Sequence, residues 1–174
     1  MTDETTNHRE RQYLLDHLAD ASITAPIVAY PEHSSIEEGK KLRGTMAGTF
    51  TKNLLLKDKK GRLFFVTAYE DTDIDLKTLH TKIGGQGRLG FASPDTVLEH
   101  LHVGPGTLTP LALFNDTDGR VTLVADQALE GAEQVNFHPM THTESIGLSW
   151  TDFTSFLVST GHEPVVVRLE ADPQ

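Results

Sequence analysis

Apolar residues recur along this chain at spacings that predict short helices and short strands. Residues 8–21 place Tyr13, Leu14, Leu18 and Ala21 on one face of a helix. The same periodicity and its flanking signals predict further helices at residues 34–44, 75–83, 93–103, 127–131 and 149–160. Strand-like runs are predicted at residues 25–29, 51–57, 63–68, 111–115, 120–125, 134–137 and 164–169.

Capping and turn residues indicate where these elements begin and end. Ser34 and Ser35 each start a capping-box pattern with a glutamate three residues on. Ser93-Pro94 is typical of a helix start, with the serine as N-cap and the proline in the first turn. Residues 58–61 and 116–119 each separate two strand-like runs, so we expect two antiparallel hairpins.

Helices and strands are interspersed without a regular alternation, which favours an α+β fold over a doubly wound sheet. We expect a single domain over residues 1–174, with a mixed, mostly antiparallel sheet flanked by helices and frayed ends at about 1–7 and 171–174. No apolar run approaches the roughly 20 residues that cross a bilayer, and no apolar segment near the N-terminus indicates a secretory signal. These absences predict a cytoplasmic protein without a membrane partner.

Composition and charge narrow the chemistry. The 174 residues include no cysteine, which excludes disulfides, a thiol nucleophile and a cysteine-ligated zinc. The net charge of −10 argues against a general nucleic-acid coat protein. Residues 40–88 nevertheless carry eleven Lys and Arg against five acids, so this stretch is +6 and the rest is −16. It is either a solvated basic hairpin or one basic face that meets phosphates.

Three familiar motifs point to no chemistry in this context. Residues 85–90 fit G-x-G-x-x-G, but a predicted helix precedes them and an apolar run follows, whereas a dinucleotide site needs a strand before and a helix after. The histidine pairs His100/His102 and His138/His142 lack an H-E-x-x-H context, so we expect no metal and no cofactor. The absence of G-x-S-x-G disfavours a serine hydrolase.

A lysine and a rigid loop are less easily explained as plain structure. Lys52 interrupts the apolar run 50–56 and shares a strand face with Leu54 and Leu56. That face is either open to solvent or buries a lysine that needs a partner. Residues 103–110, VGPGTLTP, form either a plain connector or a loop whose backbone N–H groups bind an oxyanion or a ribose.

A third segment, residues 136–143, places His138 at the end of a strand and follows it with Pro139. This histidine is either a satisfied core residue or part of a site.

Taken in order, KNLLL, GPGTLTP and NFHPMTHT resemble the prolyl-tRNA synthetase-associated editing domain family, the YbaK-like superfamily of aminoacyl-tRNA deacylases. Supporting motifs look like the same family, among them KDKKGR at 57–62, RLGFAS at 88–93, FND at 114–116 and TGHEP at 160–164. The resemblance runs from about residue 10 to 168. It implies the family's barrel-like mixed sheet and, because no synthetase domain fits in 174 residues, a free-standing member.

The resemblance implies a trans-editing hydrolase that protects translation fidelity by cleaving the ester between a wrong amino acid and the terminal adenosine of a tRNA. The implied substrate is Ala-tRNA-Pro, the implied partner is the acceptor end of tRNA-Pro, and prolyl-tRNA synthetase is a further candidate partner; no DNA is implied. The substrate's own 2′-hydroxyl would assist the attacking water. Three alternatives stay open: a non-catalytic tRNA- or synthetase-binding module on this fold, a deacylase for a different small amino acid, and a small-molecule esterase.

The family's site residues map onto this chain. The implied catalytic residues are Lys52, which would stabilise negative charge, Gly106, whose neighbouring backbone N–H groups would face the carbonyl oxygen, and His138, which would line the side-chain pocket. The implied substrate and tRNA contacts are Asn53, Arg88, Gly104, Pro105, Thr107, Thr109, Pro110 and Thr143.

The chain departs from the family pattern at Tyr30–Ser34 and at His142–Ile146. We expect both segments to border the amino-acid pocket. They therefore bear on which amino acid is removed more than on the reaction itself.

Overall fold

The computed structural model describes residues 4–32, 35–43 and 46–170. Its helices are α1 (Glu4–Asp20), α2 (Ile36–Leu42), α3 (Leu79–Ile83), α4 (Pro94–Leu101) and α5 (Trp150–Ser159), with the 3-10 helices η1 (Pro105–Thr107), η2 (Pro110–Asn115) and η3 (Gln127–Leu129). Its strands are β1 (Ile27–Ala29), β2 (Thr49–Lys57), β3 (Leu63–Tyr69), β4 (Gly90–Phe91), β5 (Val121–Asp126), β6 (Val135–Phe137), β7 (Glu144–Leu148) and β8 (Val165–Val167). No helix in these ranges combines the length and apolar character that a membrane span requires.

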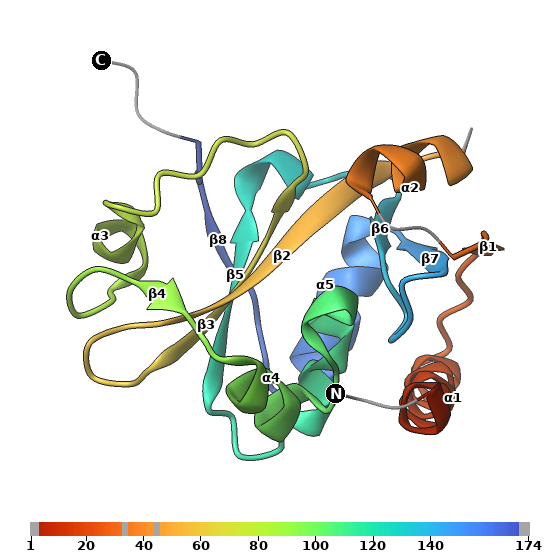
Figure 1. Ribbon diagram of the computed structural model, residues 1–174, viewed down its shortest axis with the longest axis horizontal. Helices are drawn as coiled ribbons and strands as arrows, with labels where there is room; N and C mark the ends of the chain where they lie inside the picture. Colours follow the sequence, from red (N-terminus) through yellow and green to blue (C-terminus); the bar gives the residue numbers. More distant parts are fainter. Residues whose placement is uncertain (1–3, 33–34, 44–45, 171–174) are drawn as a thin grey trace.

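The described strands form one mixed sheet in the order β1-β7-β6-β2-β3-β5-β8, with β4 beside β2 (Figure 1). Strand β2 pairs antiparallel with β3 and parallel with β6. Strand β5 lies parallel to both β3 and β8. The predicted mixed sheet flanked by helices is therefore confirmed.

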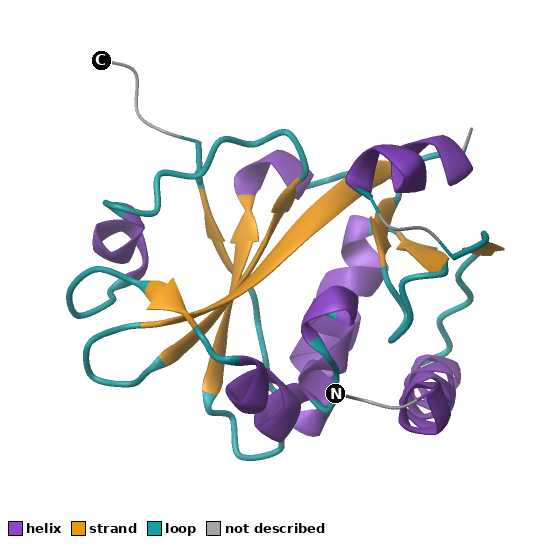
Figure 2. Ribbon diagram, viewed as in Figure 1, coloured by secondary structure: helices purple, strands orange, loops and turns teal. Residues whose placement is uncertain are grey.

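The sheet has an apolar core on each face, which fixes β2 and β3 firmly. Leu55 and Phe65 belong to the larger core, to which α1, α4 and α5 contribute. Their neighbours Leu56 and Phe64 alternate into a second core with Leu79 of α3. Figure 2 shows helices on both sides of the strands. Strand β2 is thus a rigid base from which a site can be built.

Local sequence signals predict several of these elements correctly. Ser35 caps α2 and Ser93 caps α4, each side-chain oxygen accepting a bond from the backbone N–H three residues on. The alternative cap Ser34 and the predicted end of α2 near Gly44 lie outside the described residues. Residues 58–61 form the turn between β2 and β3, as predicted.

The second predicted hairpin is wrong. Residues 110–115 form η2 instead of a strand, and β5 pairs in parallel with β3. Thr109 caps η2 through its hydroxyl, which accepts from Leu111 N–H at 3.2 Å, and Pro110 occupies the first turn. Periodicity alone cannot assign a short buried apolar run to a helix or a strand.

Three further elements differ from the sequence prediction. Helix α1 begins at Glu4, inside the segment expected to be frayed. Helix α3 begins at Leu79, because the Asp75 carboxylate holds a turn of its own by accepting from the Thr78 hydroxyl at 2.9 Å. Strand β7 is absent from the prediction. Gly147, a residue uncommon in strands, separates its alternating apolar residues Ile146 and Leu148 and packs where a Cβ would lie 2.5 Å from a neighbouring side chain.

Candidate active site

A pocket of about 340 Å³ lies where β2, β6 and α2 meet. Strand β2 contributes four consecutive residues and α2 contributes Gly39 and Lys40; Figure 1 shows α2 at the end of β2 that carries these residues. The lining consists of Tyr30, Gly39, Lys40, Arg43, Phe50, Thr51, Lys52, Asn53, Glu70, Asn136, Phe137, His138 and Ser145.

The opening arises because β2 changes partners along one edge. It pairs with β6 through Thr49 and Phe50, and with β4 through Leu56 and Lys57. Among the described strands, none pairs with that edge at residues 51–54. The two partner strands therefore diverge at this point, and β2 becomes the floor of an opening between them.

Lys52 stands on this floor, where its ammonium group donates to the backbone carbonyl of Thr72. The hydroxyl of Thr72 donates in turn to the buried carboxylate of Asp126 at 2.7 Å. The same carboxylate oxygen accepts from Tyr69 N–H at 3.1 Å. The Lys52 side chain is therefore partly buried with a hydrogen-bond acceptor, the Thr72 carbonyl. The hydrogen bonds to Asp126 hold the segment that carries this carbonyl in place.

Asn53, which lines the pocket, carries an unused acceptor. Its Nδ2 donates to the Thr51 hydroxyl at 3.2 Å, while its Oδ1 is buried and accepts no hydrogen bond within the described part of the chain. Buried polar atoms rarely lack a partner. An amide oxygen of this kind beside an open pocket is suited to a hydroxyl or ammonium donor from a ligand.

The His138 ring is oriented by strand β7. Its Nδ1 lies 2.9 Å from the backbone carbonyl of Glu144. A carbonyl only accepts, so Nδ1 bears the proton, and in the neutral ring Nε2 is the acceptor. Pro139 and Met140 follow; Met140 is fully buried with a φ of +66°, so core packing stabilises an uncommon backbone conformation next to the histidine.

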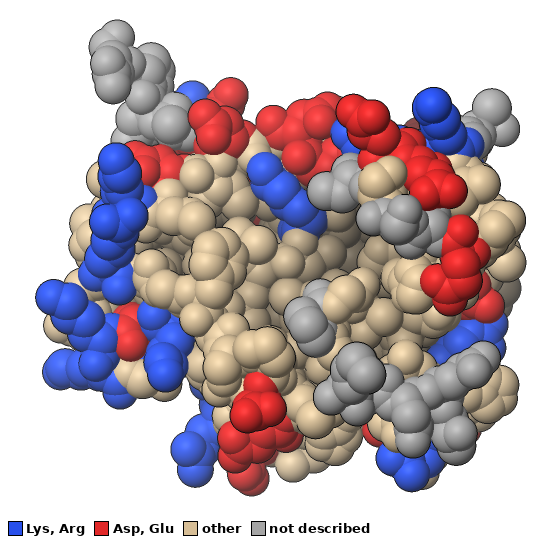
Figure 3. Space-filling view, viewed as in Figure 1, with Lys and Arg blue, Asp and Glu red and all other residues tan. Residues whose placement is uncertain are grey.

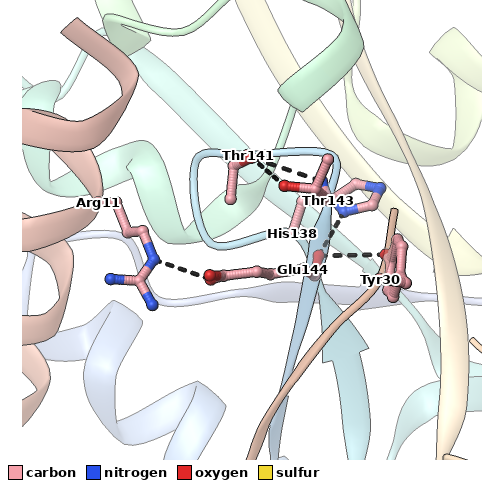
Figure 4. Close-up of polar contacts among 6 residues, drawn as sticks. All are labelled: Arg11, Tyr30, His138, Thr141, Thr143 and Glu144. Atoms are coloured by element: carbon pink, nitrogen blue, oxygen red, sulfur yellow. Dashed lines mark hydrogen bonds and ion pairs between the residues drawn. The ribbon is translucent and has the colours of Figure 1, made fainter. Parts of the chain in front are cut away.

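Tyr30 and the start of β7 form the adjoining wall (Figure 4). The Tyr30 hydroxyl donates to the Glu144 carbonyl at 3.2 Å and lies 2.9 Å from the Ser145 hydroxyl. Burial raises the pKa of the Tyr30 phenol above its usual value near 10, so the hydroxyl remains a donor at neutral pH. The Glu144 carboxylate accepts from Arg11 Nε at 2.8 Å, which links this wall to α1.

Arg43 gives the pocket a fixed positive charge. Its guanidinium makes two hydrogen bonds to the Glu70 carboxylate, at 2.8 and 3.1 Å, and lies 3.6 Å from the centre of the Phe50 ring. Among the lining residues that the structure describes, Lys40, Arg43 and Lys52 stand against a single carboxylate, that of Glu70. The pocket therefore favours an anionic or electron-rich ligand.

Three of the predicted site residues meet at this pocket: Lys52, Asn53 and His138. Tyr30 and Ser145 come from the two segments expected to border the amino-acid pocket, and both line it. The chain thus brings together residues from β2, from the end of β6 and from β7 that are far apart in sequence.

The other predicted site residues lie outside the lining of this pocket. In the loop Gly104–Pro110, the Thr107 hydroxyl donates to the Gly104 carbonyl, and the Thr109 hydroxyl caps η2. Both hydroxyls are therefore hydrogen-bonded to the backbone of the protein. Thr143 lines a neighbouring cavity of about 530 Å³ beside α1, and Arg88 is exposed ahead of β4. The roles of these residues, including the oxyanion role of Gly106, stay predictions.

Sequence reasoning missed Arg43, Phe50, Glu70 and Asn136. Arg43 and Glu70 are 27 residues apart and meet because the β2–β3 hairpin returns the chain to α2. The hairpin register could have indicated part of this arrangement. Thr51 pairs with Tyr69, so the next residues outward, Phe50 and Glu70, must be neighbours, and Glu70 N–H donates to Phe50 O at 3.0 Å.

The basic residues of the hairpin gather at the other end of β2. We call this surface the basic end; its exposed members are Lys57, Lys59, Lys60, Arg62 and Arg88. Figure 3 shows Lys and Arg side chains clustered at the lower left, where the β2–β3 hairpin lies in Figure 1. Five of the eleven cations in the positive stretch 40–88 therefore form one surface, at the far end of the strand that carries Lys52.

Comparisons with known proteins identify the family to which this sequence is similar. The family model described as "Aminoacyl-tRNA editing domain" matches residues 30–156. The chain is 43% identical over 164 residues to "Prolyl-tRNA synthetase associated domain-containing protein 1" of Bos taurus, covering 92% of this chain and 95% of that protein. It is 32% identical over 160 residues to "Prolyl-tRNA editing protein ProX" of Acetoanaerobium sticklandii, covering 91% of this chain and 97% of that protein.

A solved structure shares the fold. It is described as that of a candidate trans-editing enzyme for prolyl tRNA synthetase, and it superposes with a TM-score of 0.68 at 18% identity, covering 97% of this chain and 99% of its own.

Proposed function

Because the chain belongs to the aminoacyl-tRNA editing domain family, we propose that it hydrolyses the ester of a mischarged aminoacyl-tRNA in trans, with Ala-tRNA-Pro as its substrate. The observation that supports this proposal is the pocket in which Lys52, Asn53 and His138 meet. Its volume of about 340 Å³ lies at the small end of ligand pockets, roughly 300–1,000 Å³. That size suits an alanyl group with the adjoining ribose.

The reaction requires little chemical assistance because an aminoacyl ester is activated. Water adds to the ester carbonyl carbon, and the bond from that carbon to the ribose oxygen then breaks. The ribose oxygen takes up one proton of the water, the other proton is released to solvent, and the amino acid leaves as its carboxylate. The substrate's neighbouring 2′-hydroxyl orients the attacking water, so the protein supplies positioning and charge stabilisation.

Three pocket residues have a role in this scheme. The Lys52 ammonium, held by the Thr72 carbonyl, stabilises negative charge on the terminal phosphate or on the carbonyl oxygen. The Asn53 Oδ1 accepts from the substrate's α-ammonium group. His138 narrows the pocket and so excludes a prolyl ring by size. Size exclusion is needed because binding contacts alone separate substrates that differ by one methylene by only about 1–3 kcal/mol.

A substrate panel tests the proposal. Purified protein is incubated, with EDTA present, with Ala-tRNA-Pro, Ser-tRNA-Pro and Pro-tRNA-Pro, and loss of the acylated form is followed. We expect rapid loss of Ala-tRNA-Pro with Pro-tRNA-Pro spared. Binding of all three without hydrolysis would instead favour a non-catalytic tRNA-binding module, and hydrolysis of free small esters at an equal rate would favour a general esterase.

A further inference from the structure

An exposed aromatic ring stands beside the basic end. Phe91 of β4 is 66% exposed, more than any other large apolar side chain that the structure describes. Its strand is short but firmly placed: Phe91 pairs with Leu56 of β2, Gly90 pairs with Lys57, and the next N–H, of Ala92, donates to Leu55 O at 2.9 Å. A single exposed apolar residue is common on protein surfaces, so the surroundings of this ring decide its meaning.

The cations near this ring sit on a rigid frame. The buried Asp58 carboxylate accepts bonds from three backbone N–H groups, two in the β2–β3 turn and that of Gln86 in the loop before β4, and also from Arg62 Nε. Lys59 N–H donates to Gln86 O at 2.9 Å, which joins the same two segments. The turn and the loop therefore form one unit with a preset surface.

The charge of this surface is matched to an anion. The five cations of the basic end are exposed, whereas Asp58, the one acid between Lys57 and Arg62, is buried beneath them. The chain as a whole is −10, so an anionic partner is attracted here and repelled elsewhere. A nucleic acid offers both phosphates for the cations and flat bases for an aromatic ring, whereas an acidic peptide offers only the charge.

The ring and the pocket lie along one strand. Lys52 and Leu56 are four residues apart on β2, so their side chains share a face, and at about 3.3 Å per residue they are about 13 Å apart. Phe91 pairs directly with Leu56 and therefore shares that face. Figure 1 shows β2 running from α2 to the hairpin beside β4. The ring therefore stands beside the same strand that forms the floor of the pocket, about 13 Å along it from Lys52.

We propose that Phe91 is a stacking platform for a nucleobase near the 3′ end of the bound RNA, with the cations of the basic end on the flanking phosphates. The inference rests on the proposed function for the position of the RNA's 3′ end. Stacking on an aromatic face tolerates every base. Phe91 therefore adds affinity for the RNA strand, while selection of the amino acid belongs to the pocket.

Binding of uncharged tRNA-Pro tests the platform apart from hydrolysis. Phe91→Ala should weaken binding roughly 5- to 150-fold, and Phe91→Trp should retain it. Tyr13→Ala is the matched control, because Tyr13 is an exposed aromatic residue on α1, and it should bind like the wild type. Phe91→Ala should leave the salt dependence of log affinity unchanged, because no phosphate contact is lost.

A spectroscopic readout and a short substrate complete the test. 2-Aminopurine placed in turn at each of the 3′-terminal nucleotides should be quenched at one position by the wild type and not by Phe91→Leu, which keeps apolar bulk without an aromatic face. Hydrolysis of 3′-O-alanyl-adenosine, which is too short to reach Phe91 from the pocket, should be equal in the wild type and in Phe91→Ala.

The outcomes separate this inference from the proposed function. Equal tRNA binding by the Phe91→Ala and Tyr13→Ala variants overturns the platform and leaves the deacylase standing. Wild-type binding with the expected Phe91 dependence, but without hydrolysis of any aminoacyl-tRNA, overturns the deacylase and leaves the platform standing. A wild-type protein that binds no RNA overturns both.

Discussion

Nδ1 of His138 donates to the backbone carbonyl of Glu144 at 2.9 Å, so strand β7 sets the orientation of the pocket histidine. The same carbonyl accepts the Tyr30 hydroxyl at 3.2 Å. Two walls of the pocket therefore depend on the position of one backbone oxygen. The Glu144 side chain is held in turn by Arg11 Nε at 2.8 Å (Figure 4). Helix α1, none of whose described residues lines the pocket, thus supports its geometry.

Replacing Arg11 by alanine should loosen this support. The Arg11–Glu144 pair is partly buried, so its loss should cost about 1 kcal/mol of unfolding free energy and lower Tm by about 2–4 °C. It should also reduce kcat/KM for deacylation, because the Glu144 carbonyl that orients His138 gains freedom. Thermal melts and single-turnover kinetics measure the two effects. Partial recovery of both in the charge-swapped Arg11→Glu/Glu144→Arg protein is expected; an unchanged kcat/KM in Arg11→Ala would contradict the argument.

Removing the Lys52 ammonium should abolish most turnover without unfolding the chain. Lys52→Ala is expected to reduce deacylation of Ala-tRNA-Pro by about 10²–10³-fold, the usual effect of deleting one donor that stabilises developing charge. Lys52→Arg should restore little, because a planar guanidinium cannot replace a compact ammonium held by one carbonyl. Lys41→Ala, which alters an exposed lysine of α2 outside the pocket, is the control. Equal rates for the Lys41 and Lys52 variants would remove Lys52 from the mechanism.

The half of the site built by β2 could be predicted because its signals are local. A strand-like run, a turn at 58–61 and a second strand-like run predict the hairpin, and Lys52 and Asn53 then occupy fixed positions on it. His138 could be predicted from the family resemblance of its segment and from its place after a strand.

The other half depends on which strands become neighbours, and no local pattern encodes that order. Tyr30 and Ser145 meet because β1 pairs with β7, a short strand that contains Gly147 and only two large apolar residues. The segment 110–115 illustrates a different obstacle: its run of buried apolar residues fits a strand as well as η2, and the cap at Thr109 decides between them.

Stability of the basic end should depend on acid pH through Asp58. Burial would raise the pKa of this carboxyl, but hydrogen bonds from Gln86, Arg62 and Lys60 outweigh burial and lower the pKa to about 2. Because the unfolded-state pKa is about 3.9, the carboxylate stabilises the folded chain above about pH 4 and loses this contribution as pH falls toward 2. Asp58→Asn should therefore be less stable at pH 7, with a flatter stability profile between pH 4 and 2.

Chemical denaturation at a series of pH values measures this Asp58 profile. Asp118→Asn, at an exposed position of the turn at 116–119, is the matched control and should follow the wild-type curve. Parallel curves for Asp58→Asn and the wild type would mean that the carboxylate does not hold the turn and the loop together.

Binding of tRNA should lose salt dependence when a cation of the basic end is removed. Lys60→Ala should weaken binding and reduce the slope of log affinity against log salt by about 0.7–0.9 for one lost phosphate contact. Arg62 is a poor choice for this test, because it donates to Asp58 and to Gly84 O and its loss would disturb the frame. Arg9→Ala, on the exposed side of α1, should leave the slope unchanged. Equal slopes for Lys60→Ala and the wild type would place the hairpin away from the RNA.

Shrinking the side chain at position 138 should relax selection against proline. His138→Ala removes a ring from the pocket wall, so the ratio of kcat/KM for Pro-tRNA-Pro to that for Ala-tRNA-Pro should rise by roughly 10- to 200-fold, the range that one or a few methylenes of space confers. His138→Asn separates volume from orientation, since its amide is smaller than the ring but can still donate to the Glu144 carbonyl. If volume excludes proline, both variants hydrolyse Pro-tRNA-Pro. If the hydrogen bond matters more, only the alanine variant does so, and if both spare Pro-tRNA-Pro, exclusion of the prolyl ring lies with other residues of the lining.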